Sequence, residues 1–230
     1  IGMAAMRDFN AFLRYETKAL DGSANPLAGN VNRILVWSLS QPARLLNDYI
    51  WLGFNQDTKG RKVLDGVFNW IGGGNGLGIN YRFAQTGRTE RNRQNHLNTE
   101  APFPFAYTKT TDPLTGKTDG RSERCLATGT CPLVMNIFSG NEAWVKAGSL
   151  LHTDPATGRD IAEPAHVRNY YVSGSQHGGA SAPNTNATAV SFNSCQQFGS
   201  GVEPNPLLRA LWVALDQWAD GVAPPPSATR

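Results

Sequence analysis

The sequence predicts an α/β fold, in which a mostly parallel sheet is flanked by helices. Short apolar runs alternate with amphipathic helical stretches along the chain, which is the pattern of parallel sheets. Several of the apolar runs end in loops that begin with polar residues, as strands of open α/β sheets do at their functional edge. A chain of 230 residues, 40% hydrophobic and 17% charged, fits a single globular domain.

The first part of the chain predicts helix, strand, helix and strand in that order. An amphipathic helix is expected over 3–16, a strand over 33–37 and a helix over 41–52. A strand-like run over 63–70 leads into a glycine string at 72–78. This string lacks the Gly-Lys-Ser/Thr ending of a phosphate loop, so we expect a mobile or close-packed loop there.

A polar stretch over 85–124, rich in turn residues, is expected to form a loop-rich, lid-like insertion. Beyond it, strands are expected within 131–140 and 167–174, with a helix over 143–151 between them. A last helix within 204–222 carries one apolar face, formed by Leu208, Leu211, Leu215 and Trp218. We expect the tail, 222–230, to be extended and mobile because of its proline run.

Ser40 lies at the turn between the first predicted strand and the following helix. A nucleophilic serine is presented on such a strained turn, with small residues two positions before and after it, here Ser38 and Pro42. Ser38 is the competing nucleophile, but it would place the β-branched Val36 at the crowded position. We therefore select Ser40, expect backbone strain there, and assign the oxyanion donor to the N–H of Gln41.

A serine needs an imidazole to take its proton and a carboxylate to orient that imidazole. Glu142 follows one later strand and His177 follows the next, so the chain order is Ser40, Glu142, His177. Each of the three follows the carboxyl end of a predicted strand. The sequence therefore predicts a Ser-His-Glu triad.

Other residues of the same types offer alternatives. Glu142 is equally suited to cap the helix that follows it, because acidic side chains are favoured in a first turn. Asp154 and Asp160 are reserve candidates for the acid, and His152 and His166 are better explained as structural residues.

The three cysteines leave two interpretations open. Cys125 and Cys131 enclose a short loop that a disulfide can close, which would leave Cys195 unpaired; three reduced thiols are the alternative. A disulfide would favour a periplasmic or secreted protein. The four histidines lie in unrelated contexts without ligand spacing, so we expect neither a metal nor another cofactor.

The charge pattern predicts no nucleic-acid partner. The net charge is +3, and the cluster of Arg88, Arg91 and Arg93 near Lys109 is typical of a solvated loop. No apolar run approaches the ~20 residues of a membrane span, and no signal-peptide pattern is present.

Several segments resemble a group of large, mostly bacterial α/β-hydrolase domain proteins of poorly defined activity. The resemblance extends over nearly the whole chain, and the segments that carry it are GMAAMRDFNAFLRY, SLSQPARLLNDYIWLGFNQDTKGRKVLDG, NYRFAQ, FPFAY, NEAWVKAGSLLHTDPATG and VRNYYVSGSQHG. The resemblance implies an α/β-hydrolase-type sheet and places nucleophile, acid and base on Ser40, Glu142 and His177. The family elbow usually reads Ser-Gln-Ser-Gly-Arg, whereas this chain has Pro42 and Ala43 after Gln41. The layout is also distantly similar to glucuronoyl esterases.

Such proteins have several strands before the elbow, and this sequence contains none of them. We therefore expect residues 1–230 to be the C-terminal portion of one α/β-hydrolase domain, with the sheet completed by an N-terminal chain or fragment.

The predicted function is a serine ester hydrolase that acts on a small-molecule or polymer ester through an acyl-enzyme. Acyl transfer by the same residues is an alternative, as is a carbohydrate esterase. The non-enzymatic alternative is an inactive hydrolase-like scaffold that binds a ligand or partner. Trp51, Trp70 and Trp144 are candidates to line a pocket, although such tryptophans more often belong to a core.

Overall fold

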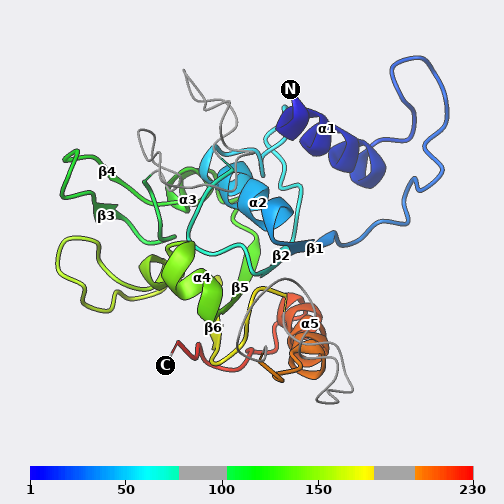
Figure 1. The fold of residues 1–230 in the computed structure, drawn as a ribbon. Helices are drawn as coiled ribbons and strands as arrows, with labels where there is room; N and C mark the ends of the chain where they lie inside the picture. Colours follow the sequence, from blue (N-terminus) through cyan, green and yellow to red (C-terminus); the bar gives the residue numbers. More distant parts are fainter. Residues whose placement is uncertain (78–102, 179–199, 230) are drawn as a thin grey trace, which may run out of the picture.

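A computed structural model describes residues 1–77, 103–178 and 200–229, and a four-stranded sheet lies at its centre (Figure 1). All neighbouring strands of this sheet are parallel, in the order β1-β2-β5-β6. The predicted parallel sheet flanked by helices is therefore confirmed. The strands are β1 Leu35–Leu39, β2 Gly66–Trp70, β5 Leu133–Ser139 and β6 Val167–Val172.

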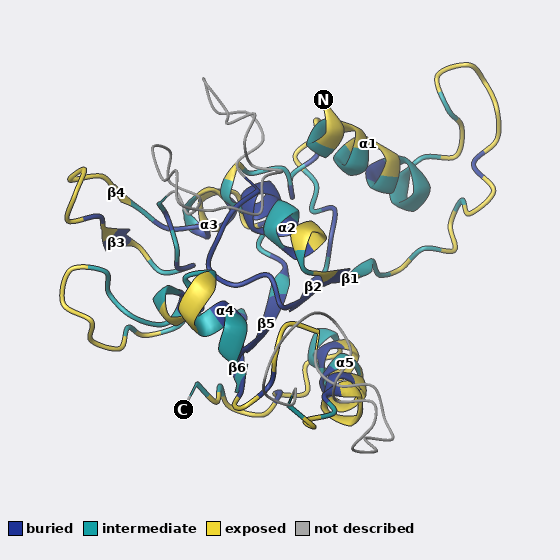
Figure 2. Cartoon of the chain, viewed as in Figure 1, coloured by how far each residue is buried: buried dark blue, intermediate teal, exposed yellow. Residues whose placement is uncertain are grey.

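Successive side chains of each strand point to opposite faces of the sheet. Both faces therefore carry apolar side chains, and helices cover both. On one face, α1 (Gly2–Tyr15) and α2 (Gln41–Trp51) pack against a buried cluster that includes Val67, Val134 and Phe138. On the other face, α5 (Asn205–Ala219) buries three leucines against the sheet. These leucines, predicted for the apolar face of α5, are Leu208, Leu211 and Leu215. In Figure 2 strand β2 and nearly all of β5 are dark blue, which marks these two strands as the buried centre of the sheet.

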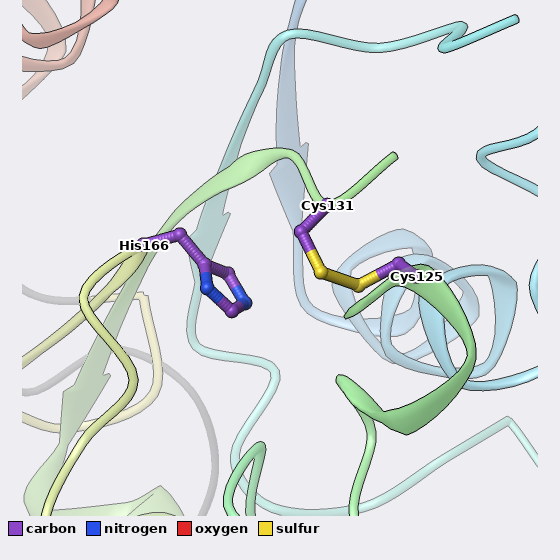
Figure 3. Close-up of side chains that lie close together, drawn as sticks. All are labelled: Cys125, Cys131 and His166. Atoms are coloured by element: carbon purple, nitrogen blue, oxygen red, sulfur yellow. A yellow bond between two sulfur atoms is a disulfide. The ribbon is translucent and has the colours of Figure 1, made fainter. Parts of the chain in front are cut away.

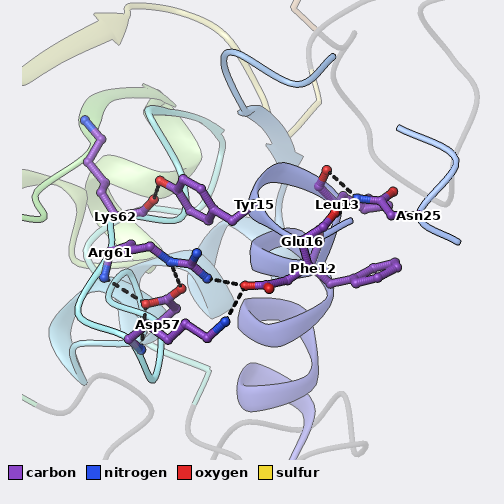
Figure 4. A network of polar contacts seen from close by, with 9 residues as sticks. Phe12, Leu13, Tyr15, Glu16, Asn25, Asp57, Arg61 and Lys62 are labelled. Atoms are coloured by element: carbon purple, nitrogen blue, oxygen red, sulfur yellow. Dashed lines mark hydrogen bonds and ion pairs between the residues drawn. The ribbon is translucent and has the colours of Figure 1, made fainter. Parts of the chain in front are cut away.

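A polar network holds the end of α1 to the segment before β2 (Figure 4). The Tyr15 hydroxyl donates to the Lys62 carbonyl over 2.6 Å. Arg61 bridges two carboxylates, at 2.7 Å from Glu16 and 2.7 Å from Asp57. This network fixes α1 against the main body of the molecule.

The described part of the predicted insertion, 103–124, contains a short hairpin of β3 (Thr110–Thr111) and β4 (Thr118–Asp119). Helix α3 (Glu123–Thr128) follows it and leads to β5. Tyr107 and other residues of the insertion are buried in the core. Residues 85–102, the remainder of the predicted lid, lie outside the described residues.

The helix predicted over 143–151 is interrupted, which corrects that prediction. Helix α4 spans Gly140–Val145, and a separate 3-10 helix, η2, spans Gly148–Leu151. Between them Ala147 has a positive φ of 51°. The Lys146 carbonyl accepts a hydrogen bond from the Gly74 N–H over 2.8 Å, so it is turned away from a continuous helix. The first part of the glycine string is thus a close-packed loop.

The tail expected to be mobile is instead attached to the edge of the sheet. The Ala228 N–H donates to the Asn169 carbonyl over 3.0 Å, and the Ala228 carbonyl accepts from the Tyr171 N–H over 2.6 Å. The Tyr170 hydroxyl donates to the Pro225 carbonyl over 2.7 Å. The proline run extends the tail, as predicted, but its last residues add a parallel bridge to β6.

None of the helices in the described ranges is both long and apolar enough to cross a membrane.

Candidate active site

Ser40 lies where β1 ends and α2 begins, and its backbone is strained as the sequence predicts. Its φ and ψ are 58° and −113°, a region that non-glycine residues rarely adopt. The Ser40 N–H donates to the Trp70 carbonyl over 2.8 Å, and the Ser40 carbonyl accepts from the Arg44 N–H over 3.3 Å. These bonds hold the turn in place and leave the Ser40 hydroxyl at the edge of the sheet.

The sequence pattern indicates close packing at Pro42, but the closely packed residue after Ser40 is Ala43. Ala43 is fully buried, and a Cβ added to Gly72 would lie 2.7 Å from the Ala43 Cβ. Ser38 is 4% exposed, and its hydroxyl donates to Asn69 Oδ1 over 2.7 Å. Its burial makes Ser38 a poor nucleophile, as the selection of Ser40 requires.

His177 lies beyond the end of β6 and reaches Ser40 across the carboxyl edge of the sheet. The distance from Ser40 Oγ to His177 Nε2 is 3.1 Å. His177 Nδ1 lies 2.6 Å from Glu142 Oε1. Because a carboxylate accepts hydrogen bonds, Nδ1 carries the proton in neutral His177, which leaves Nε2 as the acceptor for the Ser40 hydroxyl.

Glu142 caps α4 and also contacts His177, so its position is compatible with both of the roles that the sequence leaves open. It is fully buried in the first turn of α4, where its carboxylate accepts from the Ser139 N–H over 3.2 Å as part of a capping box. Asn141 donates to the Oε1 atom that also faces His177, over 2.7 Å. The cap therefore fixes the carboxylate that orients the imidazole.

The pKa of Glu142 reflects two opposing influences. Burial, the largest influence, raises it, but hydrogen bonds from His177, Ser139 and Asn141 together lower it below the usual value for a glutamate. Glu142 is consequently ionised at neutral pH, as a group that orients a histidine must be.

Gln41 is the first residue of α2, so its N–H belongs to the free N–H groups at the start of the helix. It directly follows Ser40 and lies at the positive end of the α2 dipole. A backbone N–H in this position is suited to donate a hydrogen bond to an anionic oxygen beside Ser40. Pro42, at the second helical position, interrupts no hydrogen bond of the helix because that N–H would have no partner within it.

The reserve residues lie elsewhere. Asp154 accepts hydrogen bonds from Ala156 and Thr157 within its own turn. Asp160 is 4.0 Å from His152, and these two side chains form their own pair away from His177.

The disulfide between Cys125 and Cys131 is formed in this structure (Figure 3). His166 lies beside it, and its Nε2 is 2.9 Å from Ser122 Oγ. Burial lowers the pKa of His166 to about 4. These three residues have side chains of metal-ligand type, but the disulfide occupies both sulfur atoms. Cys195 and the arginine cluster near 88–93 lie outside the described residues.

The three candidate pocket tryptophans have different environments. Trp70 is buried in the core, and Trp51 donates from Nε1 to Asp119 Oδ2 over 2.8 Å. Trp144, two residues after Glu142, is 88% exposed. Of the three, Trp144 is therefore the most exposed.

Sequence reasoning missed a row of buried asparagines beneath the site, at Asn69, Asn136 and Asn169. A signal was present, because each of the three strands carries one asparagine among apolar residues. Asn136 and Asn169 lie three residues before the ends of β5 and β6, and Asn69 lies one residue before the end of β2.

The parallel sheet and its strained strand-to-helix turn at Ser40 define the α/β-hydrolase class of fold. A family model described as an alpha/beta hydrolase domain matches residues 1–230, and the chain belongs to that family. No curated protein and no solved structure gives a significant match to the chain.

Proposed function

We propose that this protein is a serine ester hydrolase in which Ser40 is the nucleophile, His177 the general base and Glu142 the carboxylate that orients His177. The observation that carries this proposal is the continuous line of contacts from Ser40 Oγ to His177 Nε2, 3.1 Å, and from His177 Nδ1 to Glu142 Oε1, 2.6 Å. A serine, a histidine and a carboxylate in this geometry match the roles of a catalytic triad.

The reaction follows from these positions. Ser40 Oγ attacks the ester carbonyl carbon while its proton passes to His177 Nε2, and the Gln41 N–H stabilises the oxyanion. The tetrahedral intermediate collapses, and the alcohol leaves with the proton from His177. Water then attacks the acyl-Ser40 ester, again with His177 as base, and releases the carboxylic acid. If another alcohol replaces this water, the same steps give acyl transfer.

The accessibility of the site favours an external substrate. Ser40 is partly exposed, and the His177 side chain is 46% exposed. The substrate class we propose is a carboxylic ester, either a small molecule or an ester group on a polymer.

Replacement of Ser40 tests this function. In the full-length gene product, Ser40→Ala is expected to lower kcat/KM for an aryl acetate by at least about 10³-fold, because it removes the nucleophile. Ser149→Ala, an exposed serine of η2, is the matched control and should retain wild-type activity. Equal activity in wild type and Ser40→Ala would contradict the proposal. Absence of activity in both proteins would favour the alternative of an inactive hydrolase-like scaffold that binds a ligand or partner.

We further propose a periplasmic or secreted location, supported by the Cys125–Cys131 disulfide. Detection of the protein with an antibody in the periplasmic fraction or in the medium would support this location, and its confinement to the cytoplasmic fraction would contradict it.

A further inference from the structure

Four buried polar side chains lie side by side across the sheet, one on each strand. Ser38 of β1 is aligned with Asn69 of β2, Asn69 with Asn136 of β5, and Asn136 with Asn169 of β6. All four are at most 4% exposed. They lie on the face covered by α2, and we call them the polar row.

The hydrogen bonds of the polar row all run in one direction. The Ser38 hydroxyl donates to Asn69 Oδ1 over 2.7 Å, and Asn69 Nδ2 donates to Asn136 Oδ1 over 3.2 Å. Asn136 Nδ2 then donates to Asn169 Oδ1 over 2.9 Å. Each amide thus accepts from one strand and donates to the next, so that each bond polarises its neighbours.

The row ends on a carboxylate that the tail also holds. Asn169 Nδ2 donates to Glu163 Oε1 over 2.8 Å, and the Ser227 hydroxyl donates to Glu163 Oε2. Ser227 Oγ in turn accepts from the Asn169 N–H over 2.9 Å. An anion at the donating end is the favourable terminus for a row of aligned amides.

A branch connects the row to the helix that follows Ser40. Asn69 Nδ2 also lies 3.3 Å from Asn47 Oδ1 of α2, which accepts from the Tyr107 hydroxyl over 3.0 Å. Asn47 Nδ2 donates to the Asn75 carbonyl over 3.0 Å. The sheet, α2, the insertion and the loop after β2 therefore share one hydrogen-bonded network.

The row restricts the register of the strands. A shift of one residue between two strands would turn a polar side chain to the opposite, apolar face and leave its partners unsatisfied, which is costly in a buried site. Apolar pairs at these positions would tolerate small displacements better, because dispersion contacts are not directional.

We propose that the polar row is a positioning network for the candidate active site. Ser40 lies two residues beyond Ser38 on β1, and Ser139, which caps α4 and contacts Glu142, lies three residues beyond Asn136 on β5. Because the row fixes the register of the strands, it also fixes the distance between Ser40 and Glu142, which His177 bridges. The row touches no reacting atom, and this inference rests on the proposed function.

Asn136→Leu tests the proposal, since it breaks the middle of the row with a side chain of similar size. In the full-length gene product, we expect the rate at which a fluorophosphonate labels Ser40 to fall between about 10-fold and about 100-fold. For an aryl acetate, kcat should fall while KM changes little. The proton NMR signal of the deshielded hydrogen between His177 Nδ1 and Glu142 Oε1 should shift.

Met135→Leu is the matched control, because Met135 is the preceding residue of β5, fully buried, on the opposite face. Its labelling rate and NMR signal should match wild type. If Asn136→Leu does not fold, Ser38→Ala replaces it, since this change removes a single donor from the row. Its labelling rate should fall in the same direction by a smaller factor.

A folded Asn136→Leu protein with a wild-type labelling rate and an unmoved NMR signal would overturn the proposal, even if it unfolds more easily. The NMR signal also separates this inference from the proposed function. If wild type itself is not labelled, the esterase proposal fails. In that case a shifted signal in Asn136→Leu, absent in Met135→Leu, still supports the positioning role, and an unmoved signal overturns it.

Discussion

Ser40 combines an accessible hydroxyl with a backbone conformation that is unfavourable for any residue with a Cβ. Positive φ values at non-glycine residues cost of the order of 1–3 kcal/mol and persist where the surroundings impose them. At Ser40 the surroundings are the hydrogen bond to the Trp70 carbonyl and the close contact of Ala43 with Gly72. The same backbone conformation that is strained at Ser40 therefore also places its hydroxyl where it is accessible.

This strain predicts that Ser40→Gly is more stable than Ser40→Ala. Both variants lack the hydroxyl, but only glycine adopts a φ of 58° without a steric penalty. We expect the free energy of unfolding to be higher in Ser40→Gly by about 1 kcal/mol, after the larger entropy loss of glycine is included. Urea unfolding of the two variants measures the difference. Equal stabilities would show that the turn is not strained.

His166 predicts a loss of stability in mild acid. Its pKa is lowered from 6.5 in the unfolded chain to about 4 in the folded protein because the ring is buried. The unfolded state therefore binds the proton first as the pH falls. The contribution is fully present above pH 6.5 and is lost between 6.5 and about 4.

The loss from this residue should amount to about 2 kcal/mol, allowing for its partial exposure. Urea unfolding at several pH values, compared between wild type and His166→Gln, isolates it from the carboxylates that also titrate in acid. An identical pH dependence in the two proteins would contradict the assignment.

At the scale of elements, the tail supplies an added bridge at the β6 edge of the sheet. Removal of residues 223–230 would break four hydrogen bonds to β6, which involve Pro225, Ser227 and Ala228. We expect a loss of about 3–4 kcal/mol in the free energy of unfolding, at about 1 kcal/mol for each bond. Val222→Ser, an exposed position at the start of the same segment, is the control and should be neutral. A truncated protein as stable as wild type would show that the bridge contributes nothing.

The elements that the sequence predicts well are those whose signals are local. The apolar runs give β1, β2, β5 and β6, and the spacing of leucines gives the buried face of α5. The break between α4 and η2 depends on the Gly74 N–H, which is contributed by a distant loop. The attachment of the tail likewise depends on which strand lies at the edge.

In the candidate site, too, some features have local sequence signals and others depend on distant parts of the chain. The order Ser40, Glu142, His177 after strand ends is readable because parallel strands bring their carboxyl ends to one edge. The polar row is only partly readable, because each asparagine stands out within its own strand but nothing in the sequence indicates its partner. Only the strand order, β1-β2-β5-β6, brings the four side chains together.

At the scale of the whole molecule, β1 forms one end of the described sheet. Its side chains on the face covered by α5, Trp37 and Leu39, are 43% and 49% exposed, unlike the buried residues of β2. We propose that a further strand, from an N-terminal chain or fragment, pairs with β1 and covers these side chains.

The central claim is that Ser40 is an activated nucleophile. Its most direct test is incubation of the full-length gene product with a fluorophosphonate, followed by proteolysis and mass spectrometry of the peptides. We predict a single adduct on Ser40 that is absent in Ser40→Ala. Failure of Ser40 to form the adduct, or an adduct on another residue that persists in Ser40→Ala, would contradict the claim.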